Sequence, residues 1–279
     1  MHPIIKIICG PTASGKSARA IDIAQAESGV IINADAMQVY RELRVLTARP
    51  SAEEESKAPH LLYGIMPASE PCSAAKWLAQ VKVAIDDTLA SGKLPIVTGG
   101  TGLYLKALKE GLSPIPDIAP AIRTQATELW NTQHSEALRT HDPLIYERLK
   151  PGDMQRHIRA LEVMLATGKS LAHWQAEPRI KLYPDVTFDS EYIDIPRAEL
   201  YQRCDARFLI ILEAGALEEV QALYALKLSP DLPAMRAVGV PELIAHIEGK
   251  WDLDEAKKHA QQATRNYAKR QVTWFKNQS

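Results

Sequence analysis

The chain has 279 residues, of which 46% are hydrophobic and 24% are charged. These proportions are ordinary for a globular protein, and the length allows one large domain or two modest ones. The formal net charge of -1 excludes a polycation, so a nucleic-acid partner would require a locally basic surface.

Cysteine usage and hydropathy indicate the compartment. Cys9, Cys72 and Cys204 are widely spaced, and no pair has the CxxC spacing of zinc or redox motifs. We expect free thiols in a reducing compartment. The sequence has no apolar run long enough to span a bilayer and no secretory signal pattern. It therefore predicts a cytoplasmic protein without a membrane partner.

The first 112 residues alternate between predicted strands and predicted helices. Apolar runs at 4–9, 29–35 and 94–100 predict strands buried in a parallel sheet. Helix-favouring segments lie at 17–27, 73–93 and 103–112. This alternation is typical of an α/β fold with a doubly wound parallel sheet.

The pattern changes at the proline-containing stretch 113–120. Residues 121–175 show only helical patterns, residues 186–195 are a candidate strand, and the remainder is mostly helical. We predict a split α/β core at 1–114 and 191–279, the second part carrying the C-terminal helices. A helical insertion domain at 115–190 would interrupt it.

The segment GPTASGKS at 10–17 matches the phosphate-loop pattern GxxxxGK[ST], with a strand before it and a helix after it. Backbone N–H groups of such a loop form an anion-binding concavity, which glycines allow the anion to approach. Lys16 adds a positive charge, and the Ser17 hydroxyl is a candidate Mg²⁺ ligand. The predicted residues for binding a diphosphate, or a nucleotide such as ATP, are Gly10, Pro11, Thr12, Ala13, Ser14, Gly15, Lys16 and Ser17.

The loop alone does not identify the phosphate. Nucleotide hydrolysis and kinase chemistry usually need an acidic metal ligand on another strand, yet the third strand ends in IVTGGTG without a carboxylate. Asp35 follows the second strand, at the edge of the sheet where ligands bind. Alternatively, Asp35 is a helix N-cap. Gln38 could complete a capping box or pair with an adenine edge.

Several segments together carry a family resemblance. They are GPTASGKS at 10–17, INADAMQVYREL at 32–43, TARP at 47–50, GGTGLYLKAL at 99–108, DMQRHIRALEV at 153–163, and LPAMRAVGVPEL and ATRNYAKRQVTWF within 232–275. In this order they resemble the tRNA dimethylallyltransferases, also called tRNA isopentenyltransferases, of the IPP transferase family. The resemblance implies a P-loop NTPase-like fold. It also implies transfer of a dimethylallyl group from dimethylallyl diphosphate to N6 of adenosine 37 of a tRNA.

The resemblance also implies roles for matching residues. The phosphate loop and Mg²⁺ would hold the diphosphate leaving group, which accounts for the missing carboxylate. Asp35 resembles the general base for the N6 proton, and Thr101 and Arg203 resemble further catalytic residues, with Arg203 near the diphosphate. The implied tRNA contacts are Asp35, Ala36, Met37, Gln38, Thr101, Arg123, Gln155, Arg156, His157, Ile158, Arg159, Arg265 and Lys269. Ala36 and Leu46 stand where many relatives have Ser and Gly, which affects substrate recognition rather than chemistry.

The C-terminal segment favours an RNA partner without the resemblance. Residues 256–279 contain six Lys or Arg and no Asp or Glu. On a wheel of about 100° per residue, Lys258, Arg265, Lys269 and Lys276 share one helix face. Clustered like charges indicate a polyanionic partner, and a solvated helix face is the alternative. Tyr267 and Trp274 lie opposite and are predicted core anchors.

Two other classes stay open at this level. One is a P-loop phosphotransferase with a helical lid at 115–190, which leaves the basic C-terminal helix without a role. The other is a nucleotide-dependent RNA-binding module without chemistry. For the leading interpretation we expect a monomer, with the adenine and the diphosphate at opposite sides of the mouth of the sheet.

Overall fold

The computed structural model describes residues 3–278. They form two compact units, one comprising the chain up to residue 109 and from residue 182 onward, the other comprising residues 110–181. No helix among the described residues is long and apolar enough to cross a membrane. Cys9, Cys72 and Cys204 are free, as predicted.

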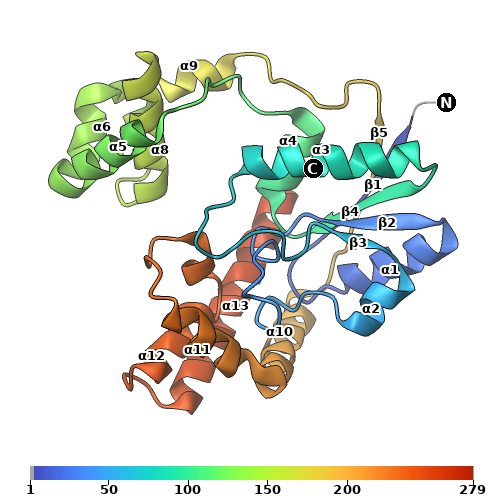
Figure 1. The fold of residues 1–279 in the computed structure, drawn as a ribbon. Coiled ribbons are helices and arrows are strands. Elements are labelled where there is room, and N and C mark those ends of the chain that lie inside the picture. Colours follow the sequence, from blue (N-terminus) through green and yellow to red (C-terminus); the bar gives the residue numbers. More distant parts are fainter. Residues whose placement is uncertain (1–2, 279) are drawn as a thin grey trace. The chain divides into compact units, whose positions relative to one another are not determined.

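A five-stranded parallel sheet forms the centre of the first unit (Figure 1). Its order is β3-β2-β4-β1-β5, with β1 at Ile4–Cys9, β2 at Gly29–Asn33, β3 at His60–Leu61, β4 at Leu94–Gly99 and β5 at Thr187–Tyr192. The three inner strands are almost wholly buried, because strands covered on both faces need apolar side chains on both. The predicted parallel α/β sheet is confirmed. The two-residue β3 is too short to leave a periodic signal.

Helices cover both faces of this sheet. In Figure 1, α1 (Lys16–Ala26) and α2 (Ala52–Lys57) lie on one side, and α3 (Ala74–Ala90) and α4 (Gly102–Glu110) lie on the other. Ser73 caps α3 by accepting the Lys76 N–H, which begins the helix where the sequence predicted it. Trp77 of α3 stacks on Tyr104 of α4, with ring centroids 4.6 Å apart. This double layer buries the inner strands.

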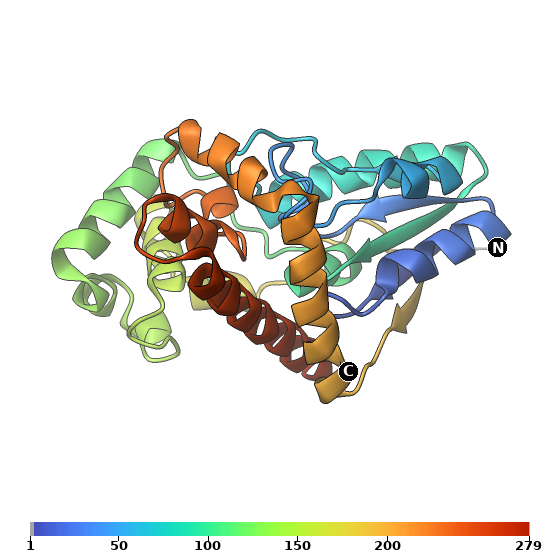
Figure 2. The ribbon, with the colours of Figure 1, turned by 90° about the horizontal axis from the view of Figure 1, so that it is seen from below.

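The chain after the sheet is helical, as predicted. Helix α10 (Arg197–Ile211) is followed by a kinked segment (Leu212–Ala216), in which Gly215 has a non-helical φ of +101°, and then by α11 (Leu217–Ala225). A 3₁₀ turn (Pro233–Arg236) and α12 (Val240–Ile247) lead to the long α13 (Leu253–Lys276). Helices α10 and α13 pack together (Figure 2), with Leu200, Cys204 and Ala268 at their contact. Residues at the two ends of the chain therefore belong to one unit.

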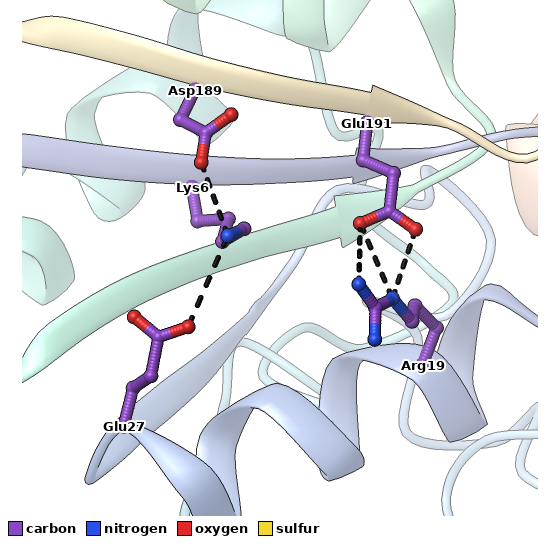
Figure 3. Close-up of polar contacts among 5 residues, drawn as sticks. All are labelled: Lys6, Arg19, Glu27, Asp189 and Glu191. Atoms are coloured by element: carbon purple, nitrogen blue, oxygen red, sulfur yellow. Dashed lines mark hydrogen bonds and ion pairs between the residues drawn. The ribbon is translucent and has the colours of Figure 1, made fainter.

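Strand β5 is fastened to the sheet by charge as well as by backbone pairing (Figure 3). Lys6 on β1 lies 3.1 Å from Asp189, and Arg19 on α1 lies 2.9 Å from Glu191. Polar side chains suit an edge strand because charge discourages pairing with other chains. The predicted boundary at 190 is wrong at this point, since residues 187–190 pair with β1. The candidate strand predicted at 186–195 is confirmed, so the error concerns only where the domain boundary was placed relative to that strand.

The second unit contains α5 (Pro120–Gln133), α6 (Ser135–His141), α7 (Pro143–Tyr146), α8 (Met154–Thr167) and α9 (Leu171–Ala176). Ala126, Leu138, Ile145 and Leu161 are buried in its own core. An isolated bridge between Leu112 and Ile180 joins the entry and exit segments. Because of that pairing the observed unit begins and ends earlier, at 110 and 181, than the predicted 115–190.

Candidate active site

The phosphate loop lies between the end of β1 and the start of α1. Gly15 is the N-cap of α1 at a φ of +90°, a conformation that glycine adopts without strain. The Ser14 N–H donates to the Pro11 carbonyl at 3.3 Å, and Lys16 Nζ donates to the same oxygen at 3.2 Å. The loop therefore curls over the N-terminus of a three-turn helix, where unpaired N–H groups and the helix dipole favour an anion.

Lys16 is affected by burial and by two neighbouring charged side chains. Burial lowers the pKa of Lys16 to about 8, an effect that the Asp35 carboxylate opposes and the Arg207 guanidinium reinforces. A partly buried lysine beside an arginine is stabilised when an anion binds between them. The loop is thus electrostatically prepared for phosphate oxygens.

Asp35 is held in a turn after β2 by the fully buried Asn33. Asn33 Oδ1 accepts the Asp35 N–H at 2.8 Å, and Asn33 Nδ2 donates to the Asp35 carbonyl at 3.1 Å. The Met37 N–H donates to Asp35 Oδ1 at 2.9 Å, so the carboxylate forms a turn. No helix begins here, and the N-cap alternative for Asp35 is wrong.

A second turn, after β4, supports the Asp35 turn. The Thr101 hydroxyl accepts the Ala36 N–H at 2.9 Å, and the Thr101 N–H donates to the Ala34 carbonyl at 3.3 Å. The Tyr267 hydroxyl of α13 also hydrogen-bonds to the Thr101 side chain, while burial raises the pKa of Tyr267. Thr101 therefore links the carboxylate-bearing turn to α13.

Gln38 and Glu219 hold the segment that walls the site. Gln38 Nε2 donates to the carbonyls of Thr47 and Ala48 at 2.9 and 3.2 Å, so it forms no capping box. Glu219 of α11 accepts three successive backbone N–H groups at 2.7–2.8 Å, from Arg44, Val45 and Leu46. These contacts fix residues 44–48 beside the phosphate loop.

These segments enclose a cavity of about 350 Å³. Its wall includes Thr12, Lys16 and Ser17 from the phosphate loop, Asp35 and Gln38 from the β2 turn, and Arg207 from α10. The phosphate loop and the carboxylate, distant in sequence, therefore share one chamber.

The charge of the cavity wall favours a polyanion. Lys16, Arg49 and Arg207 line it, against the two carboxylates of Asp35 and Glu54. Burial lowers the pKa of Arg49 and of Arg207, because removing a charged group from water is unfavourable. A bound anion would offset this desolvation penalty. Such a wall can bind a polyphosphate and keep a base beside it.

Comparison with known proteins identifies the family. The sequence profile of the IPP transferase family matches residues 38–278, and that of isopentenyl transferases matches residues 3–63. The chain belongs to the IPP transferase family. A tRNA dimethylallyltransferase of Rhodospirillum centenum is 52% identical over 285 residues, covering 99% of this chain and 89% of the relative. That of Paramagnetospirillum magneticum is 50% identical over 276 residues, covering 98% and 87%.

Solved structures agree with this assignment. A tRNA isopentenylpyrophosphate transferase of Bacillus halodurans is 30% identical with a TM-score of 0.69, covering 99% of this chain and 88% of that one. A eukaryotic dimethylallyltransferase acting on tRNA is also 30% identical, with a TM-score of 0.82, covering 98% and 69%. This IPP transferase thus shares its fold with solved members of the family, and the protein is a transferase.

The structure corrects the arginine predicted near the leaving group. Arg203 is half exposed, pairs with Glu199 at 2.6 Å and does not line the cavity. Arg207, one turn further along α10, lines the cavity and donates to the Ala48 carbonyl at 3.4 Å. The two arginines lie within about 40° on a helical wheel, so periodicity alone does not choose between them.

The predicted tRNA contacts in the insertion unit fall into two groups. Gln155 and Arg156 are exposed, and Arg123 and Arg159 both pair with the buried Glu162, at 3.2 and 2.9 Å. The other group faces the core. His157 is fully buried between Trp130 and Tyr146, with Nε2 3.0 Å from the Lys150 carbonyl, and the partly buried Ile158 packs on the core. The side chains of His157 and Ile158 therefore contribute to the core of this unit, and RNA contact at these two positions stays a prediction.

The basic face of α13 is only partly available. Lys258 and Lys269 are exposed, but Arg265 Nη1 lies 2.5 Å from Asp205 Oδ1 of α10. Tyr267, predicted as a core anchor, instead reaches the Thr101 hydroxyl at the site. The charge pattern thus locates a basic helix but not the partner of each cation.

Several cavity residues carry no clear sequence signal. Arg49 lies in the segment TARP and Thr98 directly precedes the segment GGTG, but Glu54, Tyr63 and Arg207 have no recognisable motif around them. Thr98 is the most informative, because its buried hydroxyl at the end of β4 has no hydrogen-bond partner among residues 3–278. Its position at a strand end facing the cavity is the signal that could have identified it.

The two arginines of α10 provide a matched test of the anion site. We expect Arg207→Met to weaken binding of inorganic diphosphate by about 10- to 100-fold, the loss of one charge-assisted hydrogen bond. Arg203→Met should leave the affinity unchanged, because that side chain pairs with Glu199 outside the cavity. Isothermal titration calorimetry measures both, and equal losses would contradict the placement of Arg207.

Lys16 provides a pH test. With a pKa of about 8 in the free protein, it is protonated below that pH and loses its charge as the pH rises through it. We therefore expect diphosphate affinity to fall above about pH 8, by up to tenfold per pH unit until the pKa of the complex is reached. Dividing the wild-type affinity by the affinity of Lys16→Met at the same pH removes the contribution of the ligand's own ionisation. A ratio that stays constant from pH 7 to 10 would contradict the assignment.

Proposed function

We propose that this protein transfers a dimethylallyl group from dimethylallyl diphosphate to N6 of adenosine 37 in the anticodon loop of a tRNA, releasing diphosphate. The observation that carries the proposal is that Asp35 and the phosphate loop line one cavity. The names of relatives about 50% identical over nearly the whole chain support it. A kinase would need a second acidic metal ligand, and β4 ends without one.

The phosphate loop serves the leaving group. As the bond between C1 of the allyl group and its oxygen breaks, negative charge grows on the diphosphate. Lys16 and Arg207 line the cavity at the N-terminus of α1, so we expect their stabilisation of that charge to increase in the transition state. The diphosphate departs as an anion without needing a proton from the protein.

Mg²⁺ would be bound at the phosphate loop mainly by oxygens of the substrate, with few ligands from the protein. Among the described residues no cluster of three His, Cys, Asp or Glu could hold a metal. Mg²⁺ usually binds through one or two protein oxygens together with phosphate oxygens and water. Ser17, exposed at the first turn of α1, supplies such a hydroxyl. When bound, the ion neutralises part of the leaving group's charge.

Asp35 serves the nucleophile. The N6 lone pair attacks C1 while the C1–O bond breaks, and one N6 proton passes to the carboxylate. The Met37 N–H occupies Oδ1, so we assign the proton to Oδ2. Because Asn33 fixes the backbone of Asp35 at both its N–H and its carbonyl, the orientation of the carboxylate is restricted.

Gln38 has a narrower role than bidentate pairing with adenine. Both protons of its amide are directed to the carbonyls of Thr47 and Ala48. Its Oε1 remains as the acceptor that we assign to the second N6 proton of the adenine. Ala36, Met37 and Thr101 form the adjoining turns and complete the base-binding side of the proposal.

Basic surfaces on each unit would bind the tRNA backbone. In the insertion unit Arg123 and Arg159 project from α5 and α8, each anchored by Glu162. In the first unit Lys258 and Lys269 are exposed on α13. Phosphate contacts of this type position an RNA without reading its sequence. We further infer a cytoplasmic location, which three free cysteines suit, and a monomer.

Label transfer tests the function and the base together. The protein is incubated with unmodified tRNA, Mg²⁺ and either labelled dimethylallyl diphosphate or γ-labelled ATP. We expect label on the tRNA only from the first, and a single-turnover rate about 10²- to 10⁴-fold lower for Asp35→Asn. Diphosphate affinity should be unchanged or slightly higher, because the variant removes a negative charge. Consumption of ATP instead would favour a phosphotransferase, and equal turnover would remove Asp35 as the base.

Charge reversal tests the basic face of α13. The double variant Lys258→Glu, Lys269→Glu should weaken tRNA binding by on the order of tenfold or more and reduce the salt slope by about one per lysine. Arg265→Gln is the control, because Arg265 is already paired with Asp205. Filter binding at several salt concentrations measures both. An unaltered slope in the double variant would make this face a solvated surface.

A further inference from the structure

Gln271 joins two turns that are far apart in the chain. Its side chain, on α13, is only 5% exposed. Its Oε1 accepts the Thr12 N–H of the phosphate loop at 2.8 Å, and its Nε2 donates to the Gly100 carbonyl at 2.9 Å. Thr12 and Gln271 are 259 positions apart in sequence. One buried amide therefore ties the leaving-group loop to the turn after β4.

The chemistry of the bridge requires an amide. One side needs an acceptor and the other needs a donor, and among neutral side chains of this length only glutamine carries both on one planar group. Gly100 allows the close approach, because a Cβ at this position would lie 2.1 Å from Gln271 Nε2. The Gln271 side chain thus packs directly on the backbone of the turn, where no side chain at position 100 would fit.

The bridge continues to the carboxylate. Gly100 precedes Thr101, whose hydroxyl accepts the Ala36 N–H next to Asp35. One turn before Gln271 on α13, Tyr267 hydrogen-bonds to the same Thr101 side chain. Helix α13 therefore contacts the phosphate loop directly and the Asp35 turn through Thr101.

We propose that Gln271 is a positioning residue for the transfer reaction, holding the phosphate loop and the Gly100–Thr101 turn at a fixed separation. This rests on the proposed function, because that separation sets the distance between the departing diphosphate and the nitrogen that Asp35 deprotonates. Misplacement by about 1 Å can cost on the order of 10²-fold in rate even when every reacting group is present. Gln271 itself touches neither substrate.

Two near-isosteric variants separate the two halves of the bridge. Gln271→Leu removes the acceptor and the donor. Gln271→Glu keeps the acceptor for Thr12, but at neutral pH its second oxygen opposes the Gly100 carbonyl. Protonation converts that oxygen to a donor and restores both contacts. A buried carboxyl without a cationic partner takes up this proton well above its usual pH range.

Other titratable groups near the bridge are the same in every variant. The segments packed around Gln271 contribute Cys9, Lys16, Asp35, Tyr267, Lys269 and Arg270. Division of each variant's rate by the wild-type rate at the same pH removes their titration.

The experiment measures single-turnover prenyl transfer between pH 6 and 8.5. We expect both variants to lose about 10²-fold at pH 8. The ratio for Gln271→Glu should rise about tenfold toward pH 6 as the carboxyl gains its proton, while that for Gln271→Leu stays flat. tRNA affinity should stay within about twofold, since the basic residues of α13 are untouched. Urea unfolding checks that both variants fold.

Wild-type turnover in Gln271→Leu would overturn the proposal, as would parallel pH profiles for the two folded variants. Should Gln271→Glu not fold, the rate of Gln271→Leu decides alone. Failure of the proposed function has a different signature: the wild-type protein would then transfer no prenyl group. In that case binding of inorganic diphosphate still tests the bridge, because Gln271→Leu should weaken it when the loop loses its anchor.

Discussion

The parallel register of β1, β4 and β2 is the constraint on which the site depends. Cys9 pairs with Gly99, and Asn33 pairs with Thr98, so all three strands end at the same edge of the sheet. The phosphate loop, the Asp35 turn and the Gly100–Thr101 turn each begin within two residues of that edge. A slip of one residue in one of these strands would separate them, and the close packing of helices against both faces of the sheet opposes such a slip.

The charged groups of the cavity wall have two different functions. Lys16 and Arg207 are partly buried near the N-terminus of α1, where they destabilise each other until an anion binds. Asp35 lines the same cavity, and its backbone is held by Asn33 at both its N–H and its carbonyl. This arrangement keeps the carboxylate free to accept a proton while the cations bind the leaving group.

The sequence predicts the parts of the site that are local in the chain. The phosphate loop is a contiguous pattern, and Asp35 follows a strand whose apolar run is evident, so the sequence alone points to both positions, and both line one cavity. Arg207 was missed in favour of Arg203, because helical periodicity gives the angle of a side chain but not which turn reaches the cavity. The burial of His157 could not be predicted from its amphipathic segment, because it depends on Trp130 and Tyr146 from other elements.

By itself, the sequence determined the order of strands and helices, the anion-binding loop and the basic character of the last helix, because each depends on neighbouring residues. Only the tertiary structure decided which arginine lines the cavity, and that Gln271 joins two turns. It also decided that Arg265 of α13 is paired with Asp205 whereas Lys258 and Lys269 are exposed. Those outcomes depend on contacts between residues up to 259 positions apart. Such contacts follow from strand register and helix depth, which local pattern does not encode.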